Sequence, residues 1–455
     1  EFDSYDQAMA HSAQPETLVV GLGKTGLSCA RFLARRGVPV AIVDSRESPP
    51  GLEDARIDLP AVPIFTGGFD EAVFAAAGRL VVSPGVPVSQ PQVAAARQRG
   101  IEILGDIELF AREAAAPVVA ITGSNGKSTV TTLVGEMAKR AGMRVAVGGN
   151  LGTPALDLLG PDVELYVLEL SSFQLETTRS LRAEAAVVLN ISPDHLDRYA
   201  GVEEYAAAKA SVYRDCEYAI VNFDDPLVRS MSGGRQRTGF TLAEPRADDF
   251  GIREKRGRQW ICRGAQTLMP ADDVLMPGRH NLVNALAALA LGTAVGLPFV
   301  AMVETLQTFP GLPHRTRFVT EANSVRWYND SKGTNPGASI AALEGFDRGD
   351  NSRTVLIAGG DCKGADFADL ADAAARYARA VVLMGRDAGR IAETLEDRVP
   401  LVRASDMADA VRKAAAAAQP GDRVLLSPAC ASFDMFRGFE HRGEVFETLV
   451  QELPR

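Results

Sequence analysis

Cysteine is scarce in this chain, and it follows no pairing pattern. The five cysteines are scattered along 455 residues without C-x-x-C spacing: Cys29, Cys216, Cys262, Cys362 and Cys430. Such spacing offers neither a zinc site nor a disulfide framework. We therefore expect reduced thiols in a cytoplasmic protein.

Long apolar runs and an excess of positive charge are also missing. No apolar stretch approaches the roughly eighteen residues of a membrane-spanning helix, and the first sixteen residues are polar and acidic, unlike a signal peptide. The formal net charge of −10 argues against general binding to nucleic acid or to acidic membranes, but it leaves local phosphate sites open. Because Met9 is a plausible start, we expect residues 1–8 to lie outside the native chain.

The composition is that of an ordinary globular protein, with 46% hydrophobic and 23% charged residues. Its length suggests about three domains. Apolar strand-like runs alternate with helical patterns, which predicts an α/β fold. We predict a Rossmann-like N-terminal domain (1–105), a central ATPase-type domain with a phosphate loop and a parallel or mixed sheet (106–311), and a Rossmann-like C-terminal domain (312–455).

The most informative stretch is AITGSNGKSTVTT, in which a buried strand passes through a glycine-rich turn into a helix. Such a turn holds nucleotide phosphates on backbone N–H groups at a helix N-terminus. Lys127 would reach the terminal phosphates, and Ser128 would offer its hydroxyl to Mg²⁺. Ile121 stands where the usual motif has its first glycine. The predicted ATP-contacting residues of the loop are Gly123, Asn125, Gly126, Lys127, Ser128 and Thr129.

Three further residues of the central region are candidates for the site. Glu169 ends a buried strand downstream of the loop, where an acidic residue is expected to ligate Mg²⁺ directly or through water. His195 follows the next such strand, together with Asp197, and this position favours a functional role. Lys209 lies among alanines in a helix, and from the residues alone it is better interpreted as a surface lysine.

A second glycine motif opens the chain. Gly21, Gly23 and Gly26 satisfy G-x-G-x-x-G between a strand and a helix, and Asp44 ends the next strand about twenty residues on. The turn indicates a close backbone approach to a diphosphate, which UDP, NAD and FAD all carry. A nicotinamide-dependent oxidoreductase therefore remains an alternative function.

The C-terminal region restarts the alternation with five strands: SVRWYND, TVLIAGG, AVVLMGR, PLVR and DRVLLSP. Polar residues gather just past three of the strand ends. These loops share one edge of an open parallel sheet, so the region should present its own ligand-facing surface. Together the three regions suggest ATP-driven joining of a carboxylate to an amine, in which the γ-phosphoryl group turns a carboxylate oxygen into a leaving group.

Eight segments together resemble the Mur ligase family: TGSNGKST, VLELSSFQLE, DHLDRY, HNLVNALAA, LPHRT, NDSKGTNP, GGDCKGADF and LLSPACASFDMF. The resemblance runs from Val19 to the C-terminus. It implies an ATP-dependent ligase that adds D-glutamate to the carboxylate of UDP-N-acetylmuramoyl-L-alanine through an acyl phosphate, in the cytoplasmic synthesis of peptidoglycan precursors for cell-wall growth and division. The same fold acting on another amino acid, such as L-glutamate, is the alternative.

The resemblance also implies roles for individual residues. The UDP portion would be held by Lys24, Thr25, Ser45, Arg46 and Gly85, and the muramoyl-alanine carboxylate would face Asn150 and His195. The nucleotide would be contacted by Asn281, Asn284, Arg315, Asp330 and Lys332. The incoming amino acid would be recognised by Thr334, Lys363, Ser427 and Phe433.

Two Mg²⁺ ions are expected on the same grounds. The first would be bound by Ser128 and Glu169, and the second by His195 and a carbamylated Lys209, which reverses the interpretation of Lys209 as a surface residue. A carbamate turns a cation into an oxygen ligand that suits Mg²⁺. The protein is expected to act as a monomer on UDP-N-acetylmuramoyl-L-alanine, D-glutamate and ATP.

Overall fold

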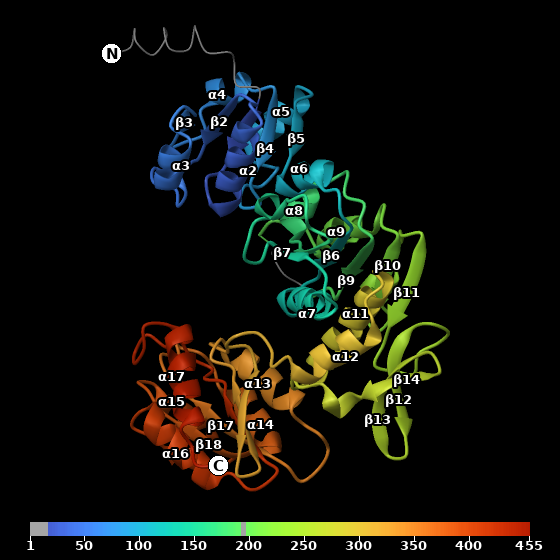
Figure 1. Ribbon diagram of the computed structural model, residues 1–455. Coiled ribbons are helices and arrows are strands. Elements are labelled where there is room, and N and C mark those ends of the chain that lie inside the picture. The colour runs from blue at the N-terminus through green and yellow to red at the C-terminus, as the bar shows by residue number, and fades with distance from the viewer. Residues whose placement is uncertain (1–16, 193–196) are drawn as a thin grey trace. The chain divides into compact units, whose positions relative to one another are not determined.

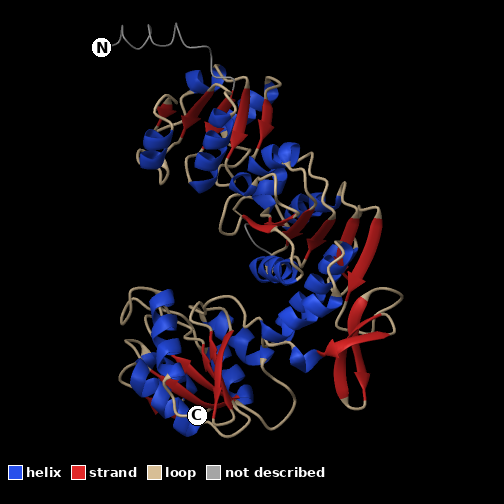
Figure 2. Cartoon of the chain, in the orientation of Figure 1, coloured by secondary structure: helices blue, strands red, loops and turns tan. Residues whose placement is uncertain are grey.

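The computed structural model describes residues 17–192 and 197–455 (Figure 1). The chain falls into two compact units, one running to residue 253 with 261–267 and 286–302, the other comprising 254–260, 268–285 and 303–455. The described residues form three sheets with helices packed beside them (Figure 2), which confirms the predicted α/β class. The boundaries near residues 105 and 311 stay predictions.

The first sheet is five-stranded and parallel, and its order β3-β2-β1-β4-β5 reverses direction between β1 and β4. Its strands are β1 (Thr17–Val20), β2 (Val40–Val43), β3 (Ile64–Phe65), β4 (Arg79–Val82) and β5 (Glu102–Leu104). The accompanying helices are α2 (Lys24–Arg35), α3 (Leu52–Asp58), α4 (Glu71–Ala75), α5 (Pro91–Gln98) and α6 (Asp106–Glu113). A ligand is expected at the loops after β1 and β4, where the order reverses.

Both faces of this sheet are buried, which explains its continuous apolar strands. Val19 and Val81 belong to the core shared with α2 and α3, whereas Leu18, Val20 and Leu80 belong to the core shared with α4 and α5. Successive strand residues point to opposite faces, so a strand covered by helices on both sides has apolar residues at every position.

The second sheet has nine strands in the order β14-β13-β12-β11-β10-β9-β6-β8-β7. They are β6 (Val118–Thr122), β7 (Val145–Gly149), β8 (Leu165–Glu169), β9 (Ala185–Val188), β10 (Tyr218–Asn222), β11 (Gln236–Phe240), β12 (Phe250–Lys255), β13 (Arg258–Arg263) and β14 (Gln266–Pro270). Its helical segments are α7 (Lys127–Arg140), η1 (Ala155–Leu158), α8 (Ser172–Glu176), α9 (Val202–Ala210), η2 (Ser211–Tyr213), α10 (Pro226–Arg229), η3 (Ala271–Asp273), α11 (Arg279–Ala294) and α12 (Phe299–Thr308).

The third sheet has the order β15-β16-β20-β17-β18-β19. Its strands are β15 (Arg317–Ala322), β16 (Val325–Asn329), β17 (Thr354–Ala358), β18 (Ala378–Leu383), β19 (Leu401–Arg403) and β20 (Arg423–Leu426), and its helices are α13 (Pro336–Gly345), α14 (Ala368–Tyr377), α15 (Ala388–Leu395), α16 (Met407–Ala417) and α17 (Phe439–Gln451). The five predicted strands are confirmed as parallel neighbours. The sequence reasoning missed β15, an antiparallel strand at the sheet's edge.

The expectation of five reduced thiols is wrong for two of them, because Cys362 and Cys430 form a disulfide. They lie in the loops after β17 and β20, which are adjacent in the sheet, and their Cα atoms are 4.5 Å apart. Sheet pairing thus brings together residues that are 68 positions apart in sequence. Cys29, Cys216 and Cys262 are buried and lie outside this disulfide.

Candidate functional site

The predicted phosphate loop lies at the carboxyl edge of the second sheet. Strand pairing places Ile121 of β6 opposite Glu169 of β8, and Gly149 of β7 opposite the same glutamate. The residues that follow these strands therefore emerge at one edge. The absence of a glycine at position 121 is explained too, because Ile121 is a fully buried strand residue and the turn begins only after it.

The turn itself has the backbone that its glycines predict. Gly123 has a φ of +145°, and a Cβ added there would lie 2.9 Å from the Leu189 side chain. Gly126, at a φ of +85°, is the N-cap of α7. The Lys127 ammonium folds back over the turn and donates to the Gly123 carbonyl at 2.9 Å. Lys127 and Ser128 thus begin the helix, with its N-terminal dipole directed at the turn.

Glu169 is joined to the loop by a hydrogen bond. The Ser128 hydroxyl donates to Glu169 Oε2 at 2.9 Å, and the side-chain amide of Asn150 donates to Glu169 Oε1 at 3.4 Å. Glu169 is only 4% exposed. A hydroxyl and a carboxylate oxygen beside a phosphate cradle are the donor types that Mg²⁺ takes, so these residues fit the first predicted ion.

Lys209 is buried, so its interpretation from the residues alone as a surface lysine is wrong. Its side chain comes from α9 and is 2% exposed, and its ammonium donates to the Gly123 carbonyl at 3.0 Å and to the Thr122 hydroxyl at 3.3 Å. His195, its expected companion, lies outside the described residues. In the part of the chain that is described, no three acidic, histidine or cysteine side chains cluster as a metal site.

Two residues that the sequence reasoning missed support the loop. The side chain of Asn190 accepts a hydrogen bond from the Asn125 backbone N–H at 2.8 Å and donates to the Asn125 carbonyl at 3.0 Å. The Tyr205 hydroxyl lies 3.1 Å from Ser124 Oγ. Asn190 follows β9 at the same sheet edge, and that position was the signal that could have identified it.

The first glycine motif also forms a tight turn. A Cβ on Gly26 would lie 1.9 Å from the Gly21 carbonyl oxygen, so only glycine permits this contact. The Ser83 hydroxyl, from the loop after β4, donates to the same carbonyl at 3.2 Å. The loops after β1 and β4 therefore meet at the point where the strand order reverses.

Asp44 is engaged by the protein itself. Its carboxylate accepts hydrogen bonds from the Leu22 backbone N–H at 2.8 Å and from the Arg46 guanidinium at 2.7 and 2.9 Å. Burial alone would raise the pKa of Asp44, but the hydrogen bonds from Arg46 and Leu22 outweigh it, so the pKa lies below its ordinary value. Asp44 thus fixes the Arg46 side chain at the mouth of the turn.

The other predicted UDP-binding residues surround this turn at the surface. Ser45, Arg46 and Gly85 are exposed, and Thr25 is half-buried in the first turn of α2. Lys24, also exposed, donates to the Gly152 carbonyl of the loop after β7 at 2.5 Å. One of the UDP candidates, Lys24, is therefore hydrogen-bonded to a loop of the phosphate-loop sheet within the same unit.

The two asparagines of α11 are held by hydrogen bonds near its N-terminus. Asn281 donates its side-chain amide to the Pro277 carbonyl at 2.8 Å, and Asn284 donates to Asn281 Oδ1 at 3.1 Å. Both side chains are buried. Burial also lowers the pKa of the adjacent His280.

Asp330, just after β16, is the most strongly positioned candidate in the second unit. Its carboxylate accepts hydrogen bonds from the Ser427 hydroxyl at 2.7 Å and from the Thr316 backbone N–H at 3.0 Å. Burial raises the pKa of Asp330 to about 6, although these hydrogen bonds act in the opposite direction. Ser427 is fully buried, so its hydroxyl is used in orienting Asp330. Arg315, Lys332 and Thr334 are exposed around it.

Lys363 and Phe433 lie on the remaining loops of this edge. Lys363 is exposed and has a φ of +47°, while the Phe433 side chain is 72% exposed. The sequence reasoning missed the buried Arg442 of α17. Its guanidinium donates to the Ser331 carbonyl at 2.7 Å and to the Cys430 carbonyl at 2.9 Å, so it ties the loop after β16 to the loop after β20.

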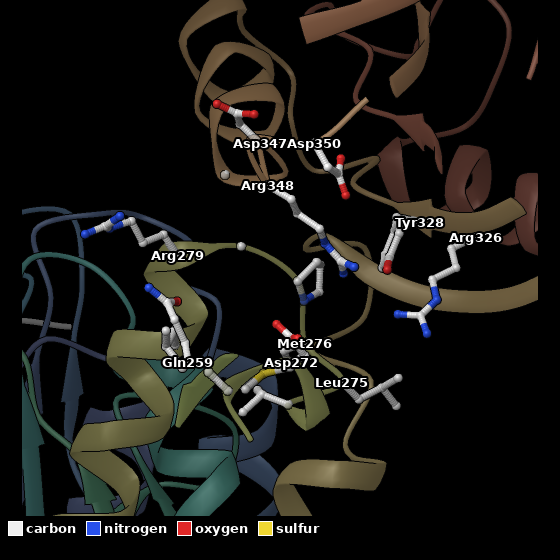
Figure 3. A pocket seen from close by; sticks show the side chains of 16 residues that line it. Gln259, Asp272, Leu275, Met276, Arg279, Arg326, Tyr328, Asp347, Arg348 and Asp350 are labelled. Carbon is white, nitrogen blue, oxygen red and sulfur yellow. The ribbon is translucent and has the colours of Figure 1, made fainter. Parts of the chain in front are cut away.

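A cavity of about 590 Å³ lies in the second unit, lined in part by Arg326 and Tyr328 of β16 (Figure 3). Its charged residues are Arg279, Arg326, Arg348, Asp272, Asp347 and Asp350. Three arginines and three aspartates therefore line the same cavity. None of the candidate site residues within the described part of the chain lines it.

Three family models match successive parts of the chain: "Mur ligase MurD-like, N-terminal domain" over residues 15–105, "Mur ligase middle domain" over 121–292 and "Mur ligase, glutamate ligase domain" over 314–430. The UDP-N-acetylmuramoylalanine–D-glutamate ligase of Pseudomonas fluorescens (strain Pf0-1) is 55% identical, covering 96% of this chain and 98% of the relative. The enzyme of the same name from Pseudomonas aeruginosa is 54% identical, again covering 96% and 98%.

Two solved structures share the fold at low sequence identity. UDP-N-acetylmuramate-alanine ligase MurC from Thermotoga maritima superposes with a TM-score of 0.55 at 18% identity, covering 96% of this chain and 99% of that one. A pseudomurein peptide ligase type C from Methanothermus fervidus gives 0.51 at 16% identity, with 95% and 100% covered. In the described residues no helix is both long and apolar enough to cross a membrane.

Proposed function

Because this chain belongs to the Mur ligase family, we propose that it joins D-glutamate to the carboxylate of UDP-N-acetylmuramoyl-L-alanine at the expense of ATP. The relatives that carry this activity in their names are more than half identical to it over nearly the whole chain. The reaction builds a peptidoglycan precursor, and we assign it to the cytoplasm. We propose that the protein acts as a monomer.

One observation carries the proposal: the hydrogen bond between Ser128 and Glu169 at the end of the phosphate loop. Amide formation in water needs an activated carboxylate, and γ-phosphoryl transfer from ATP makes a carboxylate oxygen a leaving group. Catalysis of that transfer consists mainly of positioning and of neutralising charge. The Lys127 ammonium and the backbone N–H groups of the turn would hold the phosphates, and Ser128 and Glu169 would hold the first Mg²⁺.

Lys209 is proposed as the carbamylated ligand of a second Mg²⁺, together with His195. Its burial supports this role, because the side chain is enclosed by the protein instead of extending into solvent. Its place beside the Gly123 carbonyl would bring a carbamate to the phosphate loop.

The two carboxyl edges supply the remaining substrate contacts. Lys24, Thr25, Ser45, Arg46 and Gly85 would bind the UDP portion beside the first sheet, and Asn150 would face the carboxylate to be activated. In the second unit, exposed Lys363 would pair with a carboxylate of the incoming glutamate. Thr334, Ser427 and Phe433 would complete that subsite.

The nicotinamide alternative loses its main support at Asp44. In a dinucleotide-binding fold the acidic residue after the second strand accepts a hydrogen bond from a ribose hydroxyl. Here both carboxylate oxygens of Asp44 are already bonded to Leu22 and Arg46. A fluorescence titration with NADH and NADPH is expected to show no binding.

A phosphate-release assay tests the proposal. The purified protein is given ATP, Mg²⁺, UDP-N-acetylmuramoyl-L-alanine and, in turn, a panel of D- and L-amino acids. Release should need both the UDP substrate and D-glutamate. If L-glutamate and not D-glutamate supports release, L-glutamate is the substrate. Phosphate release that does not depend on an amino acid would contradict a ligase.

A further inference from the structure

The disulfide between Cys362 and Cys430 joins two loops that carry the proposed amino-acid subsite. Cys362 immediately precedes Lys363, and Cys430 lies three residues before Phe433. The bond therefore ties the loop after β17 covalently to the loop after β20. Lys363, the group proposed to pair with glutamate, is thus the residue next to one end of this bond.

Hydrogen bonds also hold the two loops, both to each other and to neighbouring elements. The backbones of Asp361 and Ala431 form an isolated antiparallel bridge, with N–H···O distances of 3.0 and 2.9 Å. The Cys362 N–H donates to Asp387 at 2.8 Å, and Arg442 donates to the Cys430 carbonyl at 2.9 Å. Breaking the sulfur bond would thus loosen the loops without separating them.

Lys363 depends on this support because its backbone is in the left-handed region, at a φ of +47°. Residues other than glycine rarely adopt that backbone conformation, so the surrounding structure must hold it in place. A covalent tie at the preceding residue restricts the other conformations that the exposed Lys363 could otherwise take.

A disulfide is unexpected in an enzyme that uses ATP and UDP-linked precursors in the cytoplasm. In that compartment thiols are kept reduced, and the disulfides that do occur are usually transient, catalytic or redox-sensing. Cys362 and Cys430 are buried, at 4% and 1% exposed, but the neighbouring Lys363 and Gly364 are exposed, so the loop lies at the surface.

We propose that Cys362 and Cys430 are a reversible thiol–disulfide pair that sets how firmly the enzyme holds its amino-acid substrate, an inference that rests on the proposed function. A dithiol reductant breaks the S–S bond, two protein S–H groups form, and the two thiols of the reductant become a disulfide. The oxidised pair pre-organises Lys363 and lowers the KM for glutamate. The reduced enzyme remains active with a KM about threefold to tenfold higher and an unchanged KM for ATP.

The full-length protein is tested in buffers that contain reduced and oxidised dithiothreitol in varied ratios. Thiols are alkylated under denaturing conditions and counted by mass spectrometry. We expect alkylation of Cys29, Cys216 and Cys262 in oxidising buffer and of all five cysteines in reducing buffer. Five alkylated thiols in every buffer would overturn the proposal. So would a bonded pair whose oxidation leaves the KM for glutamate unchanged.

Matched variants assign the effect to this pair. Cys362→Ser and Cys430→Ser should both show the higher KM in every buffer, whereas Cys216→Ala, in the other unit, should keep the redox response. A Cys362→Ser or Cys430→Ser variant that still responds would contradict the assignment.

Hydrogen exchange of residues 359–364 provides a readout without turnover. Exchange should be slower in the oxidised protein, and equal rates would overturn the proposed constraint. Absence of glutamate-dependent phosphate release in both redox states, with the exchange difference present, would instead contradict the proposed function.

Discussion

The Ser128 hydroxyl donates a hydrogen bond to Glu169 Oε2 at 2.9 Å, although the two residues lie 41 positions apart in sequence. The bond joins the phosphate loop to the end of a buried strand. The glutamate is the last residue of β8, and the serine is in the first turn of α7. Converting Glu169 to glutamine keeps a side chain of the same shape and removes its charge. We expect kcat to fall about a hundredfold or more and the Mg²⁺ requirement to rise, because the ion loses an anionic ligand.

The measurement is a Mg²⁺ titration of phosphate release. Glu164→Gln is the matched control, since Glu164 is 44% exposed and pairs with Arg144 at the surface. A Glu169→Gln enzyme with the parent's Mg²⁺ dependence would contradict the assignment of Glu169 as a metal ligand.

Lys127→Ala should abolish the chemical step and leave binding of the UDP substrate intact. The ammonium lies over the phosphate loop, with its nitrogen 2.9 Å from the Gly123 carbonyl oxygen. The substitution therefore removes a positive charge from the proposed phosphate site. We expect kcat to fall about a hundredfold or more with the UDP-substrate Kd within about twofold of the parent. Lys139→Ala on the same helix, whose side chain is 66% exposed, should behave like the parent. Near-normal kcat for Lys127→Ala would refute the loop's role.

Gly123→Ala should damage both the loop and the fold around it. The added Cβ would lie 2.9 Å from the Leu189 side chain and 3.1 Å from its backbone nitrogen, at a φ that favours glycine. We expect a loss of about 1–3 kcal/mol in the free energy of unfolding, together with weaker ATP binding. Thermal melting and ATP titration measure the two effects. Gly68→Ala, where no atom lies within 4 Å of the new Cβ, should melt with the parent.

Lys209→Ala should inactivate the enzyme, and small carboxylates should restore part of the activity. The substitution opens space beside the Gly123 carbonyl, where acetate or formate could supply the oxygen ligands of the missing carbamate. Phosphate release with rising acetate measures the rescue. Lys127→Ala should gain nothing from acetate, because it lacks a cation and not an oxygen ligand. If Lys209→Ala also fails to respond, the carbamate loses its support.

Asp106 should make stability depend on pH. It is 2% exposed, and burial raises its pKa to about 6, although Gln174 donates to its carboxylate at 3.0 Å. A raised folded-state pKa means that the folded protein binds the proton more tightly than the unfolded chain. The stabilisation is therefore complete below about pH 4 and is lost as the pH rises through about 6.

The comparison of the parent with Asp106→Asn isolates this effect. Between pH 4 and 7 the free energy of unfolding of the parent should fall, relative to that of the variant, by up to about 3 kcal/mol, the equivalent of two pKa units. Melting curves at several pH values, taken as a difference between the two proteins, measure it. Parallel curves across that window would show that Asp106 has an ordinary pKa.

Local patterns predicted most of the strands and the phosphate loop. Strands such as β6 and β17 are buried on both faces, so their apolar runs stand out in the sequence. The edge strand β15 did not stand out, because it is half-exposed and mixes Arg317, Thr320 and Glu321 with its apolar residues. An edge strand has no neighbour on one side to require a continuous apolar run.

Contacts between distant residues could not be predicted from local patterns. The burial of Lys209 arises because α9 packs its lysine under the turn at Gly123, and its alanine-rich sequence shows little difference between its faces. The Cys362–Cys430 pair forms only because β17 and β20 are neighbours in the sheet. In the same way, Arg442 gave no signal in the sequence before α17 placed it between two loops.

Ile121 occupies the position at which this phosphate loop departs from its familiar consensus. Its carbonyl accepts the Leu170 N–H at 2.8 Å, and its backbone is paired with Glu169. The backbone of Ile121 therefore holds the end of β8 in register with β6, and this register places the Glu169 carboxylate beside the loop. A motif that requires glycine at this position would miss this chain, although the residue found there is the strand partner of Glu169.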